Sequence, residues 1–121
     1  MHKLLLFAAL ALTAAAPAEQ RIDVALSNFR FTPATIALRE GQPYLLHLTS
    51  RGGHSFAAKE FFAAATMPAA DRAKISGGKI ELESGESVDI HFTAPAPGTY
   101  RIKCTHFLHA SFGMTGAFVV R

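Results

Sequence analysis

Short apolar runs, separated by glycine or proline at intervals of roughly ten residues, constrain this chain most strongly. Within several runs apolar and polar residues alternate, as in SVDIHF at 87–92. Alternation places successive side chains on opposite faces of a strand, which indicates short strands with one buried face. We expect strands at 21–27, 43–49, 78–82, 87–92, 100–104 and 116–120, and an apolar stretch at 29–38 that bends at Pro33.

Residues 57–76 have a different pattern, because the segment is rich in alanine and lacks alternation. Alanine favours helix, whereas Pro68 interrupts it, so the segment predicts one or two short helical turns. Six to eight short strands with one helical excursion are typical of a sandwich. The sequence therefore predicts an all-β fold, an antiparallel Greek-key β-sandwich with a short helical insertion.

The segment PAPGTY at 95–100 predicts a turn that leads into a strand. Two roles are open for Tyr100: its hydroxyl ties the turn down as a corner residue, or its ring lies half-buried in the sandwich.

The first twenty residues have the order of a secretory signal: basic Lys3, an apolar run at 4–16, and then small residues. The run is short for a membrane span, and Ala16-Pro17-Ala18 offers a cleavage motif before Glu19. We expect a signal peptide at 1–18 and a folded domain at 19–121, exported to the periplasm or beyond and without a membrane span. The alternative is an uncleaved anchor.

The formal net charge is only +3, and the two signs are interspersed along the chain. This distribution argues against nucleic acid as a partner. We expect the basic residues, Arg51 and Lys59 among them, to form part of the solvated surface.

The only cysteine, Cys104, opens the segment CTHFLHASFGMTG at 104–116. An exported thiol with no partner in its own chain is exposed to oxidation, so such a cysteine is expected to be either buried or employed in a functional site. His109 and Met114 follow it in the loop that joins two expected strands, and thiolate, imidazole and thioether form a soft ligand set that favours copper. His54, in GGHSF at 52–56, is the candidate for a fourth ligand. The competing interpretation is ordinary core, since cysteine and methionine are commonly buried.

The segments GHSF at 53–56, GTY at 98–100 and the spacing C-x4-H-x4-M that ends in MTG at 114–116 resemble the cupredoxins, the small blue copper proteins, and most of all their rusticyanin and auracyanin branch. The resemblance implies one type 1 copper per chain. It implies His54, Cys104 and His109 as a trigonal ligand set and Met114 as a weak axial ligand. It also places Ser55 beside the thiolate as a hydrogen-bond donor.

The remaining histidines of the folded domain are not expected to bind the metal. His47 and His91 alternate with apolar neighbours and so belong on outward strand faces. His106 could rival His109, but C-x-H is a tight loop for two ligands, and a surface or supporting role is expected.

These observations predict an exported one-electron carrier that works with redox partner proteins, acts as a monomer and is not an enzyme. The alternative is a copper-binding protein for delivery, sequestration or resistance. A third class, an enzyme with Cys104 as nucleophile and His106 or His109 as base, lacks an obvious residue to orient the histidine.

The loop around His109 is unusually apolar, with Phe107, Leu108, Ala110, Phe112 and Gly113. We expect these residues to form a small docking patch through which the electron leaves, because transient redox encounters use small interfaces. The alternative is a loop folded back beneath residues 57–76.

Overall fold

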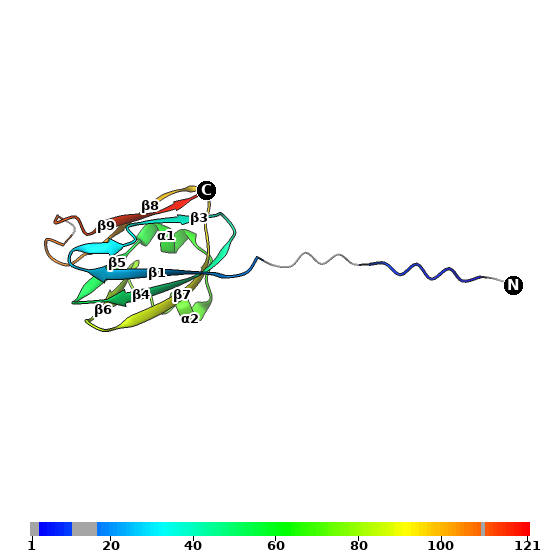
Figure 1. Ribbon diagram of the computed structural model, residues 1–121, viewed down its shortest axis with the longest axis horizontal. Helices are drawn as coiled ribbons and strands as arrows, with labels where there is room; N and C mark the ends of the chain where they lie inside the picture. The colour runs from blue at the N-terminus through cyan, green and yellow to red at the C-terminus, as the bar shows by residue number, and fades with distance from the viewer. Residues whose placement is uncertain (1–2, 11–16, 110) are drawn as a thin grey trace.

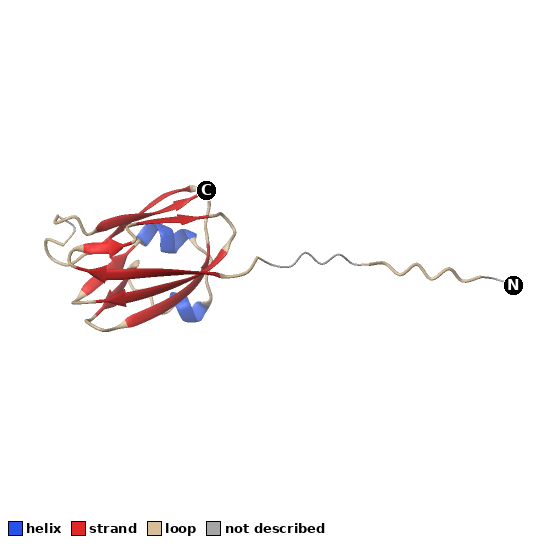
Figure 2. Cartoon of the chain, viewed as in Figure 1, coloured by secondary structure: helices blue, strands red, loops and turns tan. Residues whose placement is uncertain are grey.

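The buried side chains alternate along the strands and so define the inner faces of two sheets. The computed structural model of the chain describes residues 3–10, 17–109 and 111–121. In β4 (Pro43–Ser50) and β7 (Ser87–Thr93), inward residues such as Leu46 and Ile90 are buried, while outward residues lie nearer to solvent. The two sheets pack these inner faces against each other, as Figures 1 and 2 show.

One sheet has the strand order β2-β1-β4-β7, and the other has the order β3-β9-β8-β5-β6. The remaining strands are β1 (Gln20–Ser27), β2 (Arg30–Thr32), β3 (Thr35–Leu38), β5 (His54–Ala57), β6 (Lys79–Leu82), β8 (Gly98–Lys103) and β9 (Thr115–Val120). The all-β sandwich predicted from the sequence is confirmed.

Both sheets are mixed, which corrects the expectation of purely antiparallel pairing. β1 pairs in parallel with β4, and β3 pairs in parallel with β9. The stretch at 29–38 causes this arrangement, because it forms two strands in different sheets rather than one bent strand. β2 continues β1 as a hairpin, and after the bend at Pro33 the chain crosses to β3 in the opposite sheet.

The helical insertion closes the core between the sheets. α1 (Lys59–Ala64) and α2 (Ala69–Arg72) lie on either side of Pro68, as the sequence predicted. From α1, Phe61 and Phe62 are buried, and Phe61 stacks on Phe118 of β9 with ring centroids 3.8 Å apart. The insertion thus contributes aromatic core to the sandwich.

Tyr100 fills both of the roles that the sequence left open. Its hydroxyl donates a 2.7 Å hydrogen bond to the carbonyl of Ala96, which ties down the turn before β8. Its ring is half-buried and packs edge-on against Phe61 at 5.5 Å.

Residues 3–10 are exposed and contain neither helix nor strand. Of the predicted signal peptide, residues 1–2 and 11–16 lie outside the described part of the chain, and Ala16 of the cleavage motif is among them. Within the described residues, no helix has the length and apolar character needed to cross a membrane.

Several connections meet at the end of the sandwich opposite the C terminus. They are the β1–β2 turn, the β4–β5 loop and the long β8–β9 loop (Figure 1). This end holds the residues that the sequence singled out for metal binding.

Candidate metal centre

Two histidines and the cysteine converge at the end of the sandwich. His54, Cys104 and His109 each offer a ligand atom, and these atoms all lie within 4.8 Å of one another. Nδ1 of His109 lies 3.2 Å from Nδ1 of His54 and 3.4 Å from Sγ of Cys104. His54 and Cys104 are buried, and His109 is half-buried. The fold therefore brings together residues that are up to 55 positions apart.

The strand ends explain why these side chains meet. His54 is the first residue of β5, and Cys104 follows the last residue of β8. Gly52 has a φ of +81°, which favours glycine, and a Cβ there would lie 3.4 Å from Nε2 of His54. The turn before β5 thus favours glycine for its backbone conformation, while a Cβ at this position would only touch the imidazole.

Met114 lies fully buried at the base of the same loop, directly before β9. Its carbonyl accepts a 3.1 Å hydrogen bond from the N–H of Cys104, and its own N–H donates to the carbonyl of His109 at 3.0 Å. A third bond joins the N–H of His109 to the carbonyl of His106 at 3.1 Å. These bonds hold the loop closed, so that Cys104, His109 and Met114 keep fixed places.

The Cys104 sulfur accepts hydrogen bonds from the neighbouring strand. The Ser55 N–H donates to Sγ at 3.4 Å, and the Ser55 hydroxyl lies 3.8 Å from the same sulfur. The Thr105 N–H donates to Ser55 Oγ at 2.7 Å, and the two hydroxyl oxygens are 2.8 Å apart. Ser55 lies where the sequence placed it, whereas the part played by Thr105 was missed.

The environment of His54 favours the neutral imidazole that a metal requires. Burial lowers the pKa of His54; a backbone contact with Arg51 opposes this effect, and positive charge on His109 and His106 adds to it. A neutral ring nitrogen keeps its lone pair for a cation, so protons compete weakly at this ligand.

His106 lies beside the cluster but points to a different partner. Its Nε2 is 2.7 Å from Glu81 Oε2, and Lys79 Nζ is 3.3 Å from the other carboxylate oxygen. Partial burial raises the pKa of Glu81, but the hydrogen bonds with His106 and Lys79 outweigh burial and leave the pKa below its ordinary value. His106 is thus held by a carboxylate, in keeping with a supporting role.

The other two histidines lie on the outer face of the sheet that contains β4 and β7. His47 pairs with Asp89 at 2.5 Å, and His91 pairs with Glu19 at 2.8 Å. The hydrogen bond that the imidazole donates to the Glu19 carboxylate raises the pKa of His91. Both side chains are half-buried rather than fully exposed, and neither belongs to the cluster of His54, Cys104 and His109.

Phe29 also contacts the cluster, and sequence reasoning missed it. Its ring packs edge-on against His109, with centroids 4.7 Å apart. Asn28 and Phe29 form a two-residue turn with φ of 45° and 58°, and a positive φ is strained for a bulky side chain. The contact with the His109 imidazole accounts for a phenylalanine at this strained position.

The loop outside His109 exposes apolar side chains. Phe107 is 88% exposed and Phe112 is 65% exposed, while Leu108 is also exposed. The alternative in which residues 57–76 cover this loop is therefore wrong. We call Phe107, Leu108 and Phe112 the apolar loop patch; Ala110, which the sequence assigned to it, lies outside the described residues.

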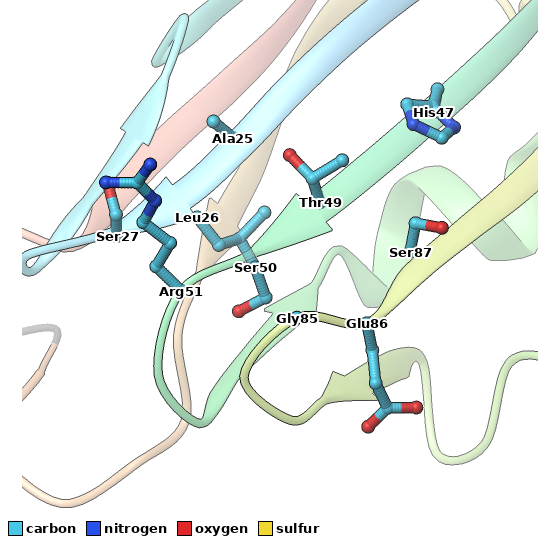
Figure 3. Close-up of a pocket in the computed structure, with 10 residues that line it drawn as sticks. All are labelled: Ala25, Leu26, Ser27, His47, Thr49, Ser50, Arg51, Gly85, Glu86 and Ser87. Atoms are coloured by element: carbon cyan, nitrogen blue, oxygen red, sulfur yellow. The ribbon is translucent and has the colours of Figure 1, made fainter.

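A groove elsewhere on the molecule is separate from this chemistry. It has a volume of about 670 Å³ and lies over β1, β4 and β7, and its lining residues, drawn in Figure 3, include His47, Arg51 and Glu86. His54, Cys104, His109 and Met114 do not line it. The cluster is a buried ligand set rather than a pocket for a small organic molecule.

The donor chemistry of the cluster fits copper. Two imidazole nitrogens and a thiol sulfur within reach of one another, beside a buried thioether residue, form the soft and mixed set that type 1 copper prefers. The amide bond to the sulfur and the closed loop provide the outer support that such a site needs.

Comparison with known proteins agrees with this donor set. A model of the cupredoxin-like domain matches residues 1–120. A search of curated proteins found no significant match. Among solved structures, auracyanin B has a TM-score of 0.62 at 22% identity, with 90% of this chain and 93% of that chain covered.

Two other auracyanins are similar over nearly their whole length. The dithionite-reduced auracyanin of Roseiflexus castenholzii has a TM-score of 0.62 at 25% identity, covering 88% of this chain and 99% of that chain. Auracyanin A of Chloroflexus aurantiacus, described as a "blue" copper protein, has a TM-score of 0.60 at 20% identity, covering 86% and 100%. The chain therefore belongs to the cupredoxin-like family, auracyanin-like in fold, and its histidine and cysteine cluster fits a single type 1 copper.

Proposed function

We propose that this protein is an exported carrier of single electrons. The observation that carries the proposal is the convergence of His54, Cys104 and His109 within a cupredoxin-like sandwich. In the proposed site these three residues would hold the copper, with Met114 as a further, weak ligand. The bound copper supplies one-electron chemistry, and the chain supplies a rigid, largely dry ligand set.

Burial of the ligands favours electron transfer over copper delivery. Cys104 is 1% exposed and Met114 is fully buried, and the hydrogen bonds of the loop hold both in place. A protein that passes copper to a partner needs ligands that the partner can reach, and here the chain buries all of them except His109, which is half-buried. We assign no catalytic residue.

The proposed boundary between signal peptide and mature domain fits the start of the sandwich. β1 begins at Gln20, and Glu19 pairs with His91. Cleavage before Glu19 would thus leave every residue of β1 in the mature protein, which we propose to be a periplasmic or otherwise exported monomer. The mass of protein recovered from an exported fraction checks this boundary.

Titration of the purified domain with Cu(II) tests the proposal. We expect an intense visible band from thiolate-to-copper charge transfer, bleached reversibly by ascorbate. Cys104→Ser should abolish the band and leave the sandwich folded, as circular dichroism would show. A folded wild-type protein that stays colourless, or that surrenders its copper at once to a weak chelator, would contradict the electron-carrier function.

A further inference from the structure

Four cations line one groove at the outer face of β8, β5 and β6: three come from these strands and one, Lys59, from the start of α1. The groove has a volume of about 300 Å³, and Lys59, Lys79, Arg101 and Lys103 line it together with Thr105. We call these four cationic residues the basic face. From the sequence, the basic residues were interpreted as a solvated surface, but the fold brings these four side chains to one groove.

Strand register explains the gathering. Ala57 on β5 pairs with Lys103 of β8 on one side and with Lys79 of β6 on the other. The small Ala57 side chain leaves a hollow between the two lysines. Arg101 shares the outward side of β8 with Lys103, because Ile102 between them is buried.

Lys59 joins the basic face through a close backbone contact. Gly78 has a φ of +76°, and a Cβ there would lie 2.7 Å from Cβ of Lys59. Only glycine permits this close approach between the turn that precedes β6 and the start of α1. The position of Lys59 over the groove is therefore built into the fold.

Most of the positive charge on this face is unneutralised. Lys79 pairs with Glu81 at 3.3 Å, whereas Lys59, Arg101 and Lys103 form no salt bridge within the described residues. Glu60 also lines the groove but is likewise unpaired there. Cations outnumber acids on this face, so its potential is positive and attracts negative charge.

The basic face adjoins the buried sulfur through the chain itself. Lys103 and Thr105, the two neighbours of Cys104, both line the groove, while Cys104 lies buried between them. A chain of polar contacts leads inward from Lys79 Nζ to Thr105 Oγ1 at 3.4 Å and on to Ser55 Oγ at 2.8 Å. Ser55 in turn contacts the sulfur.

We propose that the basic face is a second docking surface, which accepts the acidic face of a redox protein partner. A reduced partner docked there would give one electron to bound Cu(II), or an oxidised partner would take one from bound Cu(I), by a route through the backbone at Cys104; copper and partner would change oxidation state by one in opposite directions. This inference rests on the proposed electron-carrier function. It adds a partner of stated charge and a route separate from His109 and the apolar loop patch.

Oxidation of the reduced copper protein by two small reagents of opposite charge tests the proposal. The probes are hexacyanoferrate(III), an anion, and tris(phenanthroline)cobalt(III), a cation, with rates followed by stopped flow across a range of salt concentration. We expect the double variant Arg101→Glu, Lys103→Glu to slow the anionic oxidant by about tenfold or more at low salt and not to slow the cationic one.

Two control variants separate this effect from net charge and from misfolding. Arg39→Glu, Arg121→Glu changes the net charge equally at the C-terminal end of β9, whose other end pairs with Lys103, and should leave the rate with the anion within about twofold. Arg101→Lys, Lys103→Arg keeps both charges and should behave as the wild type. Equal slowing in both charge-reversed proteins, or in neither, would overturn the proposal.

A competition experiment distinguishes an acidic protein surface from a small anion as the occupant. Poly-glutamate should slow oxidation by hexacyanoferrate(III) in the wild type and have little effect in Arg101→Glu, Lys103→Glu. If the peptide does not compete, the groove accepts small anions only, and docking of an acidic protein is excluded.

Mapping on the metal-free protein separates failure of this inference from failure of the proposed function. Paramagnetic hexacyanochromate(III) should broaden the amide NMR signals of Ala57, Lys79, Lys103 and Thr105 before others. Broadening spread evenly over the surface, or centred elsewhere, would overturn the basic face even if the protein binds copper. Localised broadening in a protein that forms no coloured copper complex would instead reject the electron-carrier function and, with it, the redox role of this face.

Discussion

The N–H of Ser55 donates a hydrogen bond to Sγ of Cys104 across 3.4 Å, which joins β5 to the end of β8. The hydroxyl of the same serine is 3.8 Å from the sulfur and 2.8 Å from Oγ1 of Thr105. The backbone bond survives any substitution at Ser55 except proline, whereas the hydroxyl can be removed or redirected. The electron density on the sulfur can therefore be tuned without loss of the strand contact.

Ser55→Ala should lower the reduction potential of the copper protein, because a hydrogen bond to the sulfur stabilises the reduced state. The hydroxyl contact is long, so we expect a shift of no more than about 59 mV, equivalent to a tenfold change in a one-electron equilibrium. Thr105→Val should shift the potential in the opposite direction, because it removes the hydroxyl that lies 2.8 Å from Ser55 Oγ and leaves the sulfur as the partner of the Ser55 hydroxyl. Voltammetry measures both, and shifts of the same sign would contradict this account.

Met114 should tune the site rather than build it. Met114→Leu removes a weak axial donor while keeping an apolar side chain in a buried position, so copper and colour should persist and the potential should rise. Met114→Gln supplies a harder oxygen donor and should lower the potential. We expect the two variants to differ by at least about 59 mV. Identical potentials would remove Met114 from the ligand set.

His54→Ala and His109→Ala should each open a position at the metal. Added imidazole should restore part of the visible spectrum in both variants, because it can occupy the space left by the side chain. His106→Ala is the matched control, since His106 bonds to Glu81 and should cost little intensity. A larger loss in His106→Ala than in His109→Ala would show that the wrong loop histidine had been chosen.

Phe29→Gly should relax a strained turn and loosen the His109 imidazole at the same time. Glycine tolerates the positive φ at this position, which costs a larger residue about 1–2 kcal/mol. We expect the metal-free protein to unfold at an unchanged or higher denaturant concentration, while the His109 ring signals broaden in NMR spectra. Phe29→Leu, which keeps bulk and strain, should be less stable than Phe29→Gly. If Phe29→Gly is less stable than the wild type, the packing of the Phe29 ring contributes more free energy than the positive φ costs.

The apolar loop patch should govern electron self-exchange between two copies of the protein. Phe112→Lys places a charge on this surface and should slow self-exchange by about tenfold or more, with the visible spectrum unchanged. Ala37→Lys adds the same charge at an exposed position on β3 and is the control. NMR line broadening at several salt concentrations measures the rate, and an unaltered rate for Phe112→Lys would mean that this patch is not the contact.

The sequence was most informative where one residue type has few uses. A lone cysteine spaced evenly from a histidine and a methionine identified the loop at 104–114, and alternation located most strands. β5 was not predicted as a strand. Both of its faces are buried: Ser55 contacts Thr105 on one side, and Phe56 lies in the core on the other. A strand with two buried faces does not show the regular alternation of apolar and polar residues from which the other strands were predicted.

Pairing direction and long-range contacts were beyond the reach of local patterns. The parallel pairing of β1 with β4 follows from the crossing of the chain at Pro33, which periodicity does not report. Phe29 looked like part of a strand, although it forms a turn and contacts His109 from another part of the fold. The basic face likewise depends on register at Ala57, which aligns lysines distant in the sequence.

The burial of Cys104 has a consequence for the life of the protein before any metal arrives. A disulfide forms when a thiolate attacks a second sulfur in line, and a side chain that is 1% exposed gives no such approach. A folded chain in an oxidising compartment would therefore keep its single thiol reduced and would not cross-link to a second copy. Folding alone would therefore keep the thiol available as a ligand until copper binds.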